Sequence, residues 1–189
     1  MKQALLDLLV DTRDQGTLTP NMNASEIITG ALTAADGAVY AVHRGIPRFI
    51  ELDDDKQAQT RDAFSFKWQK RDTYEDPNSA ILHGAWMLER YGFESLEAWA
   101  AQFSMKRRIL DLGCGSGWSS SMWLNTPGWS GDALWVGADI STAVDVAQDR
   151  LRHIANVHFV QADALHLPFA DGTFDVIFSE GVLHHTPST

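Results

Sequence analysis

The sequence has little of several features that mark whole classes of protein. It contains a single cysteine, Cys114, among 189 residues, so no disulfide can form within the chain. It also has no apolar run of about 18 residues, the length that a membrane-spanning helix needs, and an acid, Asp7, interrupts the apolar residues at its start. We therefore expect a cytoplasmic protein with no membrane span and no secretory signal.

Positive charge is also scarce. The chain has 15 Lys and Arg residues against 25 Asp and Glu residues, which gives a formal net charge of -10. Binding to a nucleic-acid backbone depends on clusters of Lys and Arg, and the sequence has only two short basic runs, at residues 67–71 and 106–108. We therefore expect a small-molecule substrate and no nucleic-acid partner.

Glycine, in contrast, is concentrated at one informative place. The apolar run Ile109–Leu112 is followed by Gly113, Gly115 and Gly117, and then by a helix-like segment. Glycine allows positive φ angles and a close approach of a ligand to the backbone. The first N–H groups of a following helix are unpaired and suit an anionic or polar ligand. The pattern predicts a strand, a cofactor-binding turn and a helix.

Two kinds of cofactor turn fit part of this pattern. A dinucleotide fingerprint, G-x-G-x-x-G, needs a third glycine for close packing of helix and strand, but Trp118 occupies that position. This makes an NAD-dependent oxidoreductase the least favoured hypothesis. The run from Asp111 to Gly117 reads D-x-G-x-G-x-G and resembles the first motif of the class I S-adenosylmethionine-dependent methyltransferases. The resemblance implies that Asp111 holds the methionine amino group of the cofactor, often through water.

Further acids follow at the ends of later predicted strands. Asp139 ends an apolar run 26 residues after Gly113, near the distance at which nucleotide-binding folds place an acid on the ribose. The resemblance implies that Asp163 accepts from the adenine amino group and that the backbone N–H of Ala164 serves the ring. Each acid alone is explained equally well as a helix cap or loop residue; the joint pattern favours the cofactor. The predicted cofactor-binding residues are Asp111, Gly113, Cys114, Gly115, Ser116, Gly117, Asp139, Ile140, Asp163, Ala164 and Ser179.

Two of these residues allow alternative roles. Ser116 is expected to cap the helix that begins near Trp118, to offer its backbone N–H to the cofactor carboxylate, or to do both. Cys114 is interpreted as a small side chain tolerated under the cofactor, which we favour over a redox or nucleophilic role. No metal ligands are predicted.

The predicted fold class is α/β. Strands are expected at residues 109–112, 134–139, 157–163 and 174–179, with helices between them, including one opened by Ser141 as N-cap. Strands that alternate with helices pair in parallel through right-handed crossovers. The resemblance implies a partial doubly wound sheet with strand order 3-2-1-4, because three more strands are typical of the family and the sequence ends at Thr189. We expect a truncated domain in which the fourth strand is an exposed edge available for self-association.

The part of the chain before this core divides into two. Residues 1–50 are predicted to form a small β-hairpin module apart from the nucleotide fold, with strands at 27–28 and 39–42 around the turn pair Asp36-Gly37. This module resembles a zinc-ribbon-like unit, but Asp11, Asp14, Thr33 and Asp36 stand where the cysteines would be, so we expect it to be metal-free. Residues 51–78 are predicted to be a linker and an aromatic segment, and residues 79–189 the cofactor-binding domain.

Two helices and a lid complete the prediction. Residues 79–103 have helical spacing of apolar residues, with a break expected at Gly92. The aromatic segment at residues 64–68 resembles an element found before related methyltransferase cores. It is interpreted either as a lid over the cofactor or, preferably, as a segment packed on the core, and Phe66 and Trp68 are the residues that would distinguish these hypotheses.

Catalytic residues are the least defined part. His184 and His185 follow the fourth predicted strand, and histidine is a residue type suited to proton transfer, so either could act as a general base; a role in shaping the loop is the preferred interpretation. The predicted function is transfer of a methyl group from S-adenosylmethionine to a small-molecule, lipid or sugar-linked acceptor, with S-adenosylhomocysteine as product. The alternative is a cofactor-binding chain that lacks activity because its substrate-binding half is absent.

Overall fold

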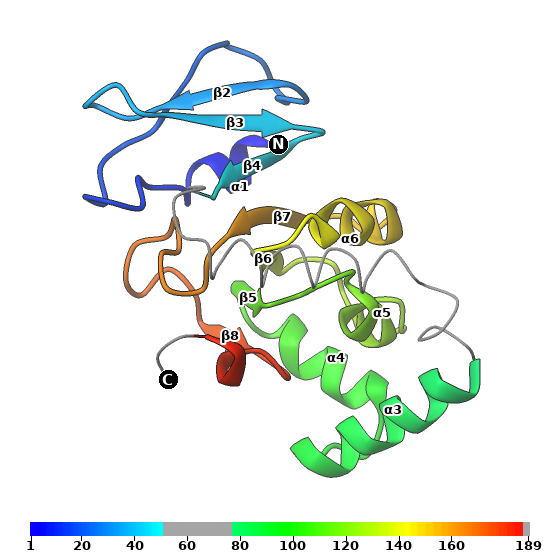
Figure 1. Cartoon of the computed structure of the whole chain (residues 1–189). Coiled ribbons are helices and arrows are strands. Elements are labelled where there is room, and N and C mark those ends of the chain that lie inside the picture. The colour runs from blue at the N-terminus through cyan, green and yellow to red at the C-terminus, as the bar shows by residue number, and fades with distance from the viewer. Residues whose placement is uncertain (51–76, 187–189) are drawn as a thin grey trace.

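The computed structural model describes residues 1–50 and 77–186. The predicted linker and the aromatic segment with Phe66 and Trp68 lie outside these residues, so the lid hypothesis is not addressed by the structure. Figure 1 shows a layered α/β arrangement in which a parallel sheet is continued by antiparallel strands from the N-terminal part of the chain.

Four parallel strands form the part of the sheet that the glycine turn joins. They are β5 (Arg108–Leu112), β6 (Leu134–Asp139), β7 (Val157–Ala162) and β8 (Val176–Phe178). Their spatial order is β7-β6-β5-β8, which confirms the predicted order 3-2-1-4. Asp111 pairs in register with Gly137 on one side and with Phe178 on the other. The strand register thus brings the carboxyl ends of β5, β6 and β8 to one edge of the sheet, where ligands of such folds bind.

The predicted helices at residues 79–103, after the glycine turn and after Ser141 are confirmed, and two short helical segments, Gln3–Leu6 and Leu183–His185, were not predicted. The helical elements are α1 (Gln3–Leu6), α3 (Pro77–Tyr91), α4 (Leu96–Ser104), α5 (Trp118–Leu124), α6 (Ala143–Leu151) and the 3-10 turn η2 (Leu183–His185). The predicted break at Gly92 is confirmed, because Gly92 has φ 72° and ends α3. Ser95 then starts α4 by accepting a hydrogen bond from the backbone N–H of Ala98 at 3.1 Å. Over the described residues, every helix is too short or too polar to cross a bilayer.

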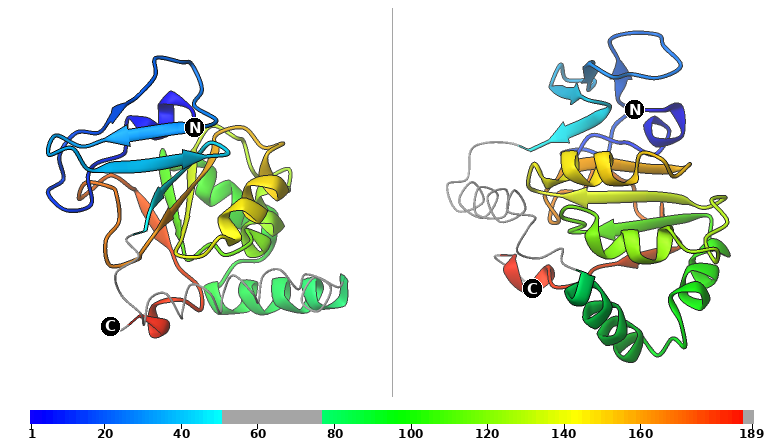
Figure 2. Two further views of the ribbon diagram at one scale, coloured as in Figure 1. Left: turned by 45° about the horizontal axis from the view of Figure 1, so that its top comes forward. Right: turned by 90° about the vertical axis from the view of Figure 1, so that its right-hand side faces the viewer.

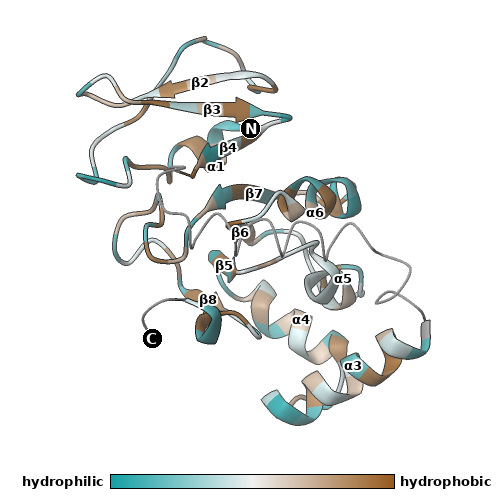
Figure 3. Ribbon diagram, in the orientation of Figure 1, coloured by the Kyte–Doolittle hydropathy of each residue, from teal (hydrophilic) through white to brown (hydrophobic). Residues whose placement is uncertain are grey.

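Alternate residues of the parallel strands pack into two separate cores. On one face, rings of α4, α5, β6 and β8 cluster, and the centroids of Trp99 and Trp123 lie 4.7 Å apart. Such aromatic contacts add about 0.5–1.5 kcal/mol per pair to the energy of burying the rings. The helix α6 covers the same face with Val144, Ala147 and other buried side chains, and its opposite side is hydrophilic in Figure 3.

The antiparallel strands are β1 (Thr19–Pro20), β2 (Gly30–Thr33), β3 (Val39–His43) and β4 (Ile46–Phe49). The hairpin turn at Asp36-Gly37 is as predicted, with Gly37 at φ 92° donating to the carbonyl of Ala34. The prediction of a strand at residues 27–28 was wrong. Ile27 is buried, but its N–H donates to the carbonyl of Met1, outside the β2–β3 ladder, and the strand that pairs with β3 begins at Gly30.

The N-terminal segment belongs to the same sheet as the nucleotide fold, whereas the sequence led us to expect a module apart from it. The first half of β4 pairs with β3, and its second half pairs in parallel with β7 through Arg48 opposite Gln161. The second core contains Leu5 and Leu9 together with residues of β5, β6 and β7 such as Val160. Leu5, Leu9 and their N-terminal neighbours thus cover the sheet face that α4–α6 leave open. The helix α3 lies at the end of the molecule opposite the N-terminal segment in both views of Figure 2. The boundaries at residues 50 and 78 stay a prediction.

Candidate cofactor site

The glycine turn is attached to the neighbouring strand by its backbone. The N–H groups of Gly113 and Cys114 both donate to the carbonyl of Ala138, at 2.7 and 3.1 Å. Gly117 has φ 67°, and a β-carbon added to it would lie 3.1 Å from the β-carbon of Ala147 on α6. Glycine is therefore required at Gly117 both for the backbone conformation and for the close approach of α6.

Asp111 lies at the end of β5 beneath this turn and is 4% exposed. Its Oδ2 accepts a hydrogen bond from the hydroxyl of Ser120, on the first turn of α5. Burial raises the pKa of Asp111 to about 7, while the Ser120 hydrogen bond lowers it and the nearby Asp139 raises it. An ammonium group placed beside this carboxylate would favour its ionised form. Sequence reasoning missed Ser120, because its partner lies nine residues away along the chain.

Asp139, at the end of β6, holds the middle of the glycine turn through a hydrogen bond. Its Oδ2 accepts from the backbone N–H of Gly115 at 2.9 Å, and its Oδ1 accepts from the N–H and the hydroxyl of Ser141 at 2.8 and 2.6 Å. Burial raises the pKa of Asp139, and these hydrogen bonds oppose the shift. A carboxylate has about four acceptor positions, so Asp139 retains capacity for a hydroxyl of a ligand.

Ser141 was predicted to be the N-cap of the following helix, and this was wrong by one residue. The helix α6 begins at Ala143 with Thr142 as N-cap, whose side chain makes no capping bond. The hydroxyl of Ser141 still accepts from the N–H of Ala143 at 3.3 Å, while it donates to Asp139. The hydroxyl of Ser141 therefore links the Asp139 carboxylate to the first residue of α6.

Two serine hydroxyls beside the turn are buried without a hydrogen-bond partner in the described part of the chain. They belong to Ser116 and Ser179. The expected capping role of Ser116 was wrong, because the N-cap of α5 is Gly117 and no side chain caps that helix. The backbone carbonyl of Ser116 accepts a hydrogen bond from Nε of Arg150 at 3.0 Å. Unsatisfied buried hydroxyls are costly, so two of them beside one turn fit a site that receives a polar ligand.

The other predicted cofactor residues lie along the same edge. The carboxylate of Asp163 accepts from the N–H of Leu165 and from Nδ1 of His166, each at 3.1 Å. Asp163 therefore stabilises its own loop, which was the alternative to adenine binding in the sequence analysis. Ala164 follows it and packs on the core of the second sheet face. The carbonyl of Ile140 accepts from the amide of Gln161 at 2.9 Å. Binding to adenine stays a prediction for Asp163 and Ala164.

Cys114 is part of the glycine turn, and its side chain packs against the aromatic core. Burial raises the pKa of its thiol, and the carboxylates of Asp111 and Asp139 raise it further. The thiol is thus held in the neutral form, which is poorly nucleophilic. This environment supports the interpretation of Cys114 as a small side chain beneath the ligand.

The loop after β8 folds back over the glycine turn. A β-carbon added to Gly113 would lie 2.2 Å from Cγ2 of Val182. Glu180, in the same loop, accepts a hydrogen bond from the hydroxyl of Tyr91, and its carboxylate lies 3.4 Å from Nε of Arg90. These contacts tie the loop to the end of α3. Sequence reasoning missed Val182 and Glu180 because nothing in their spacing indicates which loop covers the turn.

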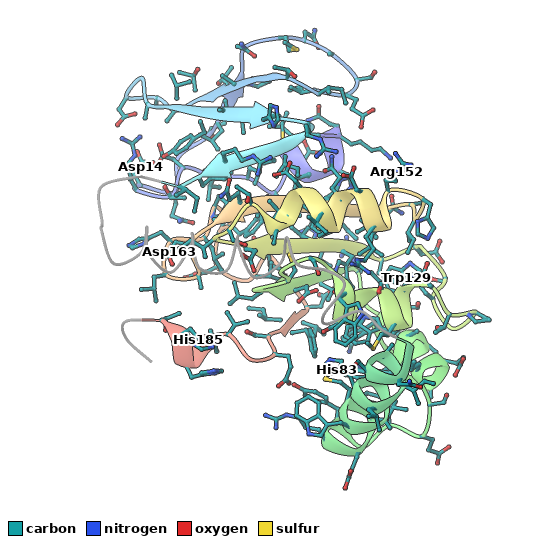
Figure 4. The ribbon with its side chains drawn as sticks, turned by 45° about the vertical axis from the view of Figure 1, so that its right-hand side comes forward. Asp14, His83, Trp129, Arg152, Asp163 and His185 are labelled. Atoms are coloured by element: carbon teal, nitrogen blue, oxygen red, sulfur yellow. The ribbon has the colours of Figure 1, made fainter. Side chains whose placement is uncertain are left out.

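The two histidines of this loop are exposed. His184 and His185 lie on η2, with ring centroids 4.0 Å apart. In Figure 4, His185 lies on the same side of the sheet as Asp163, whereas His83 lies on α3 toward the other end. Exposure at the mouth of the site is compatible both with proton transfer and with a loop-shaping role, so the catalytic role stays a prediction. Among the described residues, no three His, Cys, Asp or Glu side chains are grouped to hold a metal ion.

A second aromatic contact lies where α5 begins. The ring of His83 stacks on that of Trp118, with centroids 4.8 Å apart, and its Nε2 lies 3.3 Å from the hydroxyl of Ser119. Burial lowers the pKa of His83. Trp118, which excluded the dinucleotide fingerprint, therefore packs against α3 instead of permitting the close helix–strand contact that a third glycine provides.

The fold and the site define a class. A parallel sheet of order 3-2-1-4, a glycine turn after its first strand, a buried acid at the end of β5 and a part-buried acid at the end of β6 are the features of a doubly wound, nucleotide-type binding domain. Residues 109–189 match the family described as "Methyltransferase domain". This part of the chain is thus similar to methyltransferase domains in both its sequence and its strand order.

Relatives with known names are similar over much of the chain. The chain is 32% identical over 159 residues to "Ubiquinone/menaquinone biosynthesis C-methyltransferase UbiE" of Haemophilus ducreyi, which covers 82% of this chain and 57% of that protein. It is 33% identical over 115 residues to the "Fatty-acid O-methyltransferase" of Mycolicibacterium smegmatis, covering 60% of this chain and 41% of that protein. The chain thus spans about half the length of the curated relatives that it matches.

Two solved structures that are similar to part of the chain are methyltransferases by name. One is the phosphoethanolamine N-methyltransferase 1 of Haemonchus contortus in complex with S-adenosylhomocysteine, at 23% identity and TM-score 0.36, covering 63% of this chain and 25% of that one. Another is the O-methyltransferase TomG of Streptomyces achromogenes, at 20% identity and TM-score 0.37, covering 69% and 55%.

Proposed function

We propose that this chain binds S-adenosylmethionine over the Gly113–Gly117 turn and transfers its methyl group to a small-molecule acceptor, releasing S-adenosylhomocysteine. The observation that carries the proposal is the buried carboxylate of Asp111 beneath the turn, in the segment that matches the methyltransferase domain family. A buried acid with a raised pKa is the kind of group that a cationic ligand stabilises.

The residues present fit the cofactor group by group. Asp111 would hold the ammonium group, and the buried hydroxyl of Ser116, which lacks a partner among the described residues, would serve the carboxylate together with its backbone N–H. Asp139 would accept from the ribose hydroxyls. Asp163 and Ala164 would serve the adenine. When bound, the sulfonium centre supplies an electrophilic methyl group.

The chain's own contribution to the reaction is positioning. Methyl transfer is an in-line displacement, so holding nucleophile and methyl group in line and excluding water supplies much of the acceleration. The loop with Glu180 and Val182 covers the turn and is held by Tyr91, which suits the exclusion of water. His184 or His185 would accept a proton from a hydroxyl acceptor if one of them is the general base.

The acceptor is a small molecule, and within that class we favour a lipid. Named relatives act, by their printed names, in ubiquinone and menaquinone biosynthesis and on fatty acids. Near the covering loop, Leu183 is 50% exposed, and on α3 Trp86 is 43% exposed, which favours an apolar acceptor. The net charge of -10 opposes binding to a nucleic-acid backbone.

Titration calorimetry with S-adenosylhomocysteine and with NAD tests cofactor choice. We expect binding of S-adenosylhomocysteine in the micromolar range and none of NAD; binding of NAD alone would overturn the proposal. A methyl-transfer assay with labelled cofactor and a polyprenylated phenol, a fatty acid and a glycolipid then tests acceptor class. Cofactor binding without transfer to any acceptor would instead favour the cofactor-binding chain without activity.

Single substitutions separate the two roles of the histidine pair. If His184 or His185 is the general base, His184→Ala or His185→Ala lowers turnover by about 10²-fold or more while leaving S-adenosylhomocysteine affinity unchanged. A loop-shaping role, which we favour, lowers turnover and affinity together and by less than about tenfold. The pH profile of turnover distinguishes them, because loss of a base removes its titration limb.

The zinc-ribbon-like origin of residues 1–50 is part of the proposal, and so is the absence of a metal from them. The absence of a metal is supported by an ion-pair cluster at two of the four positions where a zinc ribbon would have cysteines. The guanidinium of Arg13 lies 2.7 Å from Oδ2 of Asp11 and 2.8 Å from Oδ1 of Asp36. Asp14 instead closes its own turn on Gly16. Elemental analysis of the purified protein for zinc tests this, and a stoichiometric metal content would contradict it.

A further inference from the structure

The buried carboxylate beneath the glycine turn has one side-chain donor within the described residues. Ser120, itself 1% exposed, donates from its hydroxyl to Oδ2 of Asp111. Its neighbour Ser121 donates instead to the backbone carbonyl of Trp118 at 2.6 Å. Two adjacent serines on α5 therefore have different partners, and only one of them reaches the acid at the end of β5.

The surroundings of Asp111 otherwise oppose a negative charge. On the β6 side the nearest titratable group is Asp139, whose carboxylate raises the pKa of Asp111. The thiol of Cys114 lies in the turn above it. On the β8 side its register partner is Phe178, which offers no hydrogen bond from its side chain. The Ser120 hydroxyl is thus the stabilising group for the ionised form among otherwise unfavourable neighbours.

We propose that Ser120 is a positioning residue that favours the ionised form of the Asp111 carboxylate and fixes its orientation for an ammonium-bearing ligand on the glycine turn. The inference rests on the proposed function for the identity of that ligand, but the contact itself does not. A hydrogen bond to a charged acceptor is stronger than a neutral one. It also acts before the ligand arrives, which lowers the cost of binding.

The sign of the expected effect follows from the two forms of the acid. An ammonium group binds the carboxylate and not the neutral acid, so ligand affinity rises as the pH passes upward through the pKa of Asp111, near 7. Removing Ser120 removes a contact that lowers this pKa, so the rise in affinity moves to higher pH. The loss of ligand affinity that removal of Ser120 causes is therefore larger at pH 6.5 than at pH 8.5. A general loss of stability would reduce affinity without this dependence on pH.

The experiment compares Ser120→Ala with Ser121→Ala in the whole chain. Carboxyl-carbon NMR on the ligand-free protein follows the titration of Asp111, whose signal is assigned by its absence in Asp111→Asn. We expect the Asp111 midpoint to rise by about one pH unit in S120A and to stay unchanged in S121A. Calorimetry with S-adenosylhomocysteine should show about a tenfold loss for S120A at pH 6.5 and a smaller loss at pH 8.5.

The same midpoint in S120A as in the wild type would overturn the inference, and so would equal affinity losses in S120A and S121A at both pH values. If S120A fails to fold, Ser120→Cys retains a weaker donor and should give an intermediate midpoint; an unshifted midpoint there would also overturn it. Failure of the proposed function is distinguishable, because the wild type would then not bind S-adenosylhomocysteine while the NMR titration still reported on Ser120.

Discussion

Val182 lies directly against Gly113, with no room for a side chain between them. A β-carbon on Gly113 would lie 2.2 Å from one methyl carbon of Val182 and 2.5 Å from the other. Gly113 also has φ 76°, in the left-handed region. The first glycine of the turn is thus required twice, once by its backbone and once by the loop that follows β8.

Replacing Gly113 by alanine should therefore displace the covering loop and strain the turn. We expect Gly113→Ala to lower stability by about 2–5 kcal/mol, because it combines a left-handed alanine, about 1–2 kcal/mol, with overpacking of about 1–3 kcal/mol. S-adenosylhomocysteine affinity should fall at least about tenfold. Urea unfolding and calorimetry measure the two effects.

Gly172 offers a matched control. It has φ 73°, and no atom lies within 4 Å of a β-carbon built on it. Gly172→Ala should therefore cost only the conformational strain, about 1–2 kcal/mol, and leave ligand affinity unchanged. Equal effects of the two substitutions would show that the contact with Val182 has no consequence.

Asp139 links the end of β6 to the turn through Gly115. In Asp139→Asn, one acceptor oxygen becomes a donor amide, so the bond to Gly115 or those to Ser141 must be lost. We expect cofactor affinity to fall about tenfold or more, and unfolding free energy by about 1–3 kcal/mol. Asp132→Asn, at an exposed loop position, is the matched control and should change neither. Unchanged affinity in D139N would contradict a role for this acid at the site.

Asp11 and Arg13 predict a pH dependence of stability. The hydrogen bonds from Arg13 lower the pKa of the buried Asp11 to about 2, from 3.8. Because the folded pKa is the lower one, the stabilisation is complete above about pH 4 and is lost as the pH falls toward 2. Asp11→Asn should destabilise the protein by about 1–3 kcal/mol at pH 7, and this difference should shrink between pH 4 and pH 2.

Urea unfolding of the wild type and the D11N variant across this pH range is the measurement. Asp14→Asn serves as control, since the exposed Asp14 makes its hydrogen bond only to the N–H of Gly16. A D11N effect that is constant from pH 7 to pH 2 would show that the ion pair is not its source.

The fourth parallel strand predicts self-association. Among the described residues, β8 has only β5 as a neighbouring strand, and Ile177 on it is 61% exposed. An exposed strand edge of this kind can pair with a second copy. Sedimentation velocity should show a concentration-dependent dimer, and Ile177→Lys should reduce it, since an edge lysine opposes pairing. A monomer at every concentration tested would contradict this prediction.

Much of the parallel core could be predicted from local sequence. The runs 109–112, 134–139 and 157–162 are apolar and end in turn residues, so their strand identity follows from short-range patterns. Their parallel pairing follows from the alternation with helices, whereas the order 3-2-1-4 was implied by the family resemblance. The N-terminal segment was harder. Its hairpin turn at Asp36-Gly37 is a local signal, but the pairing of β4 with β7 joins Arg48 to Gln161, far along the chain. No periodicity within residues 1–50 indicates that contact.

The sequence by itself determined that a glycine turn with an acid before it follows the first core strand, because backbone freedom and strand ends are local properties. Only the tertiary structure decided which groups meet there. Ser120 reaches Asp111, Asp139 holds Gly115, and Val182 covers Gly113. Each contact joins separate elements, and its geometry depends on strand register and helix packing, which are set by the whole core and not by neighbouring residues.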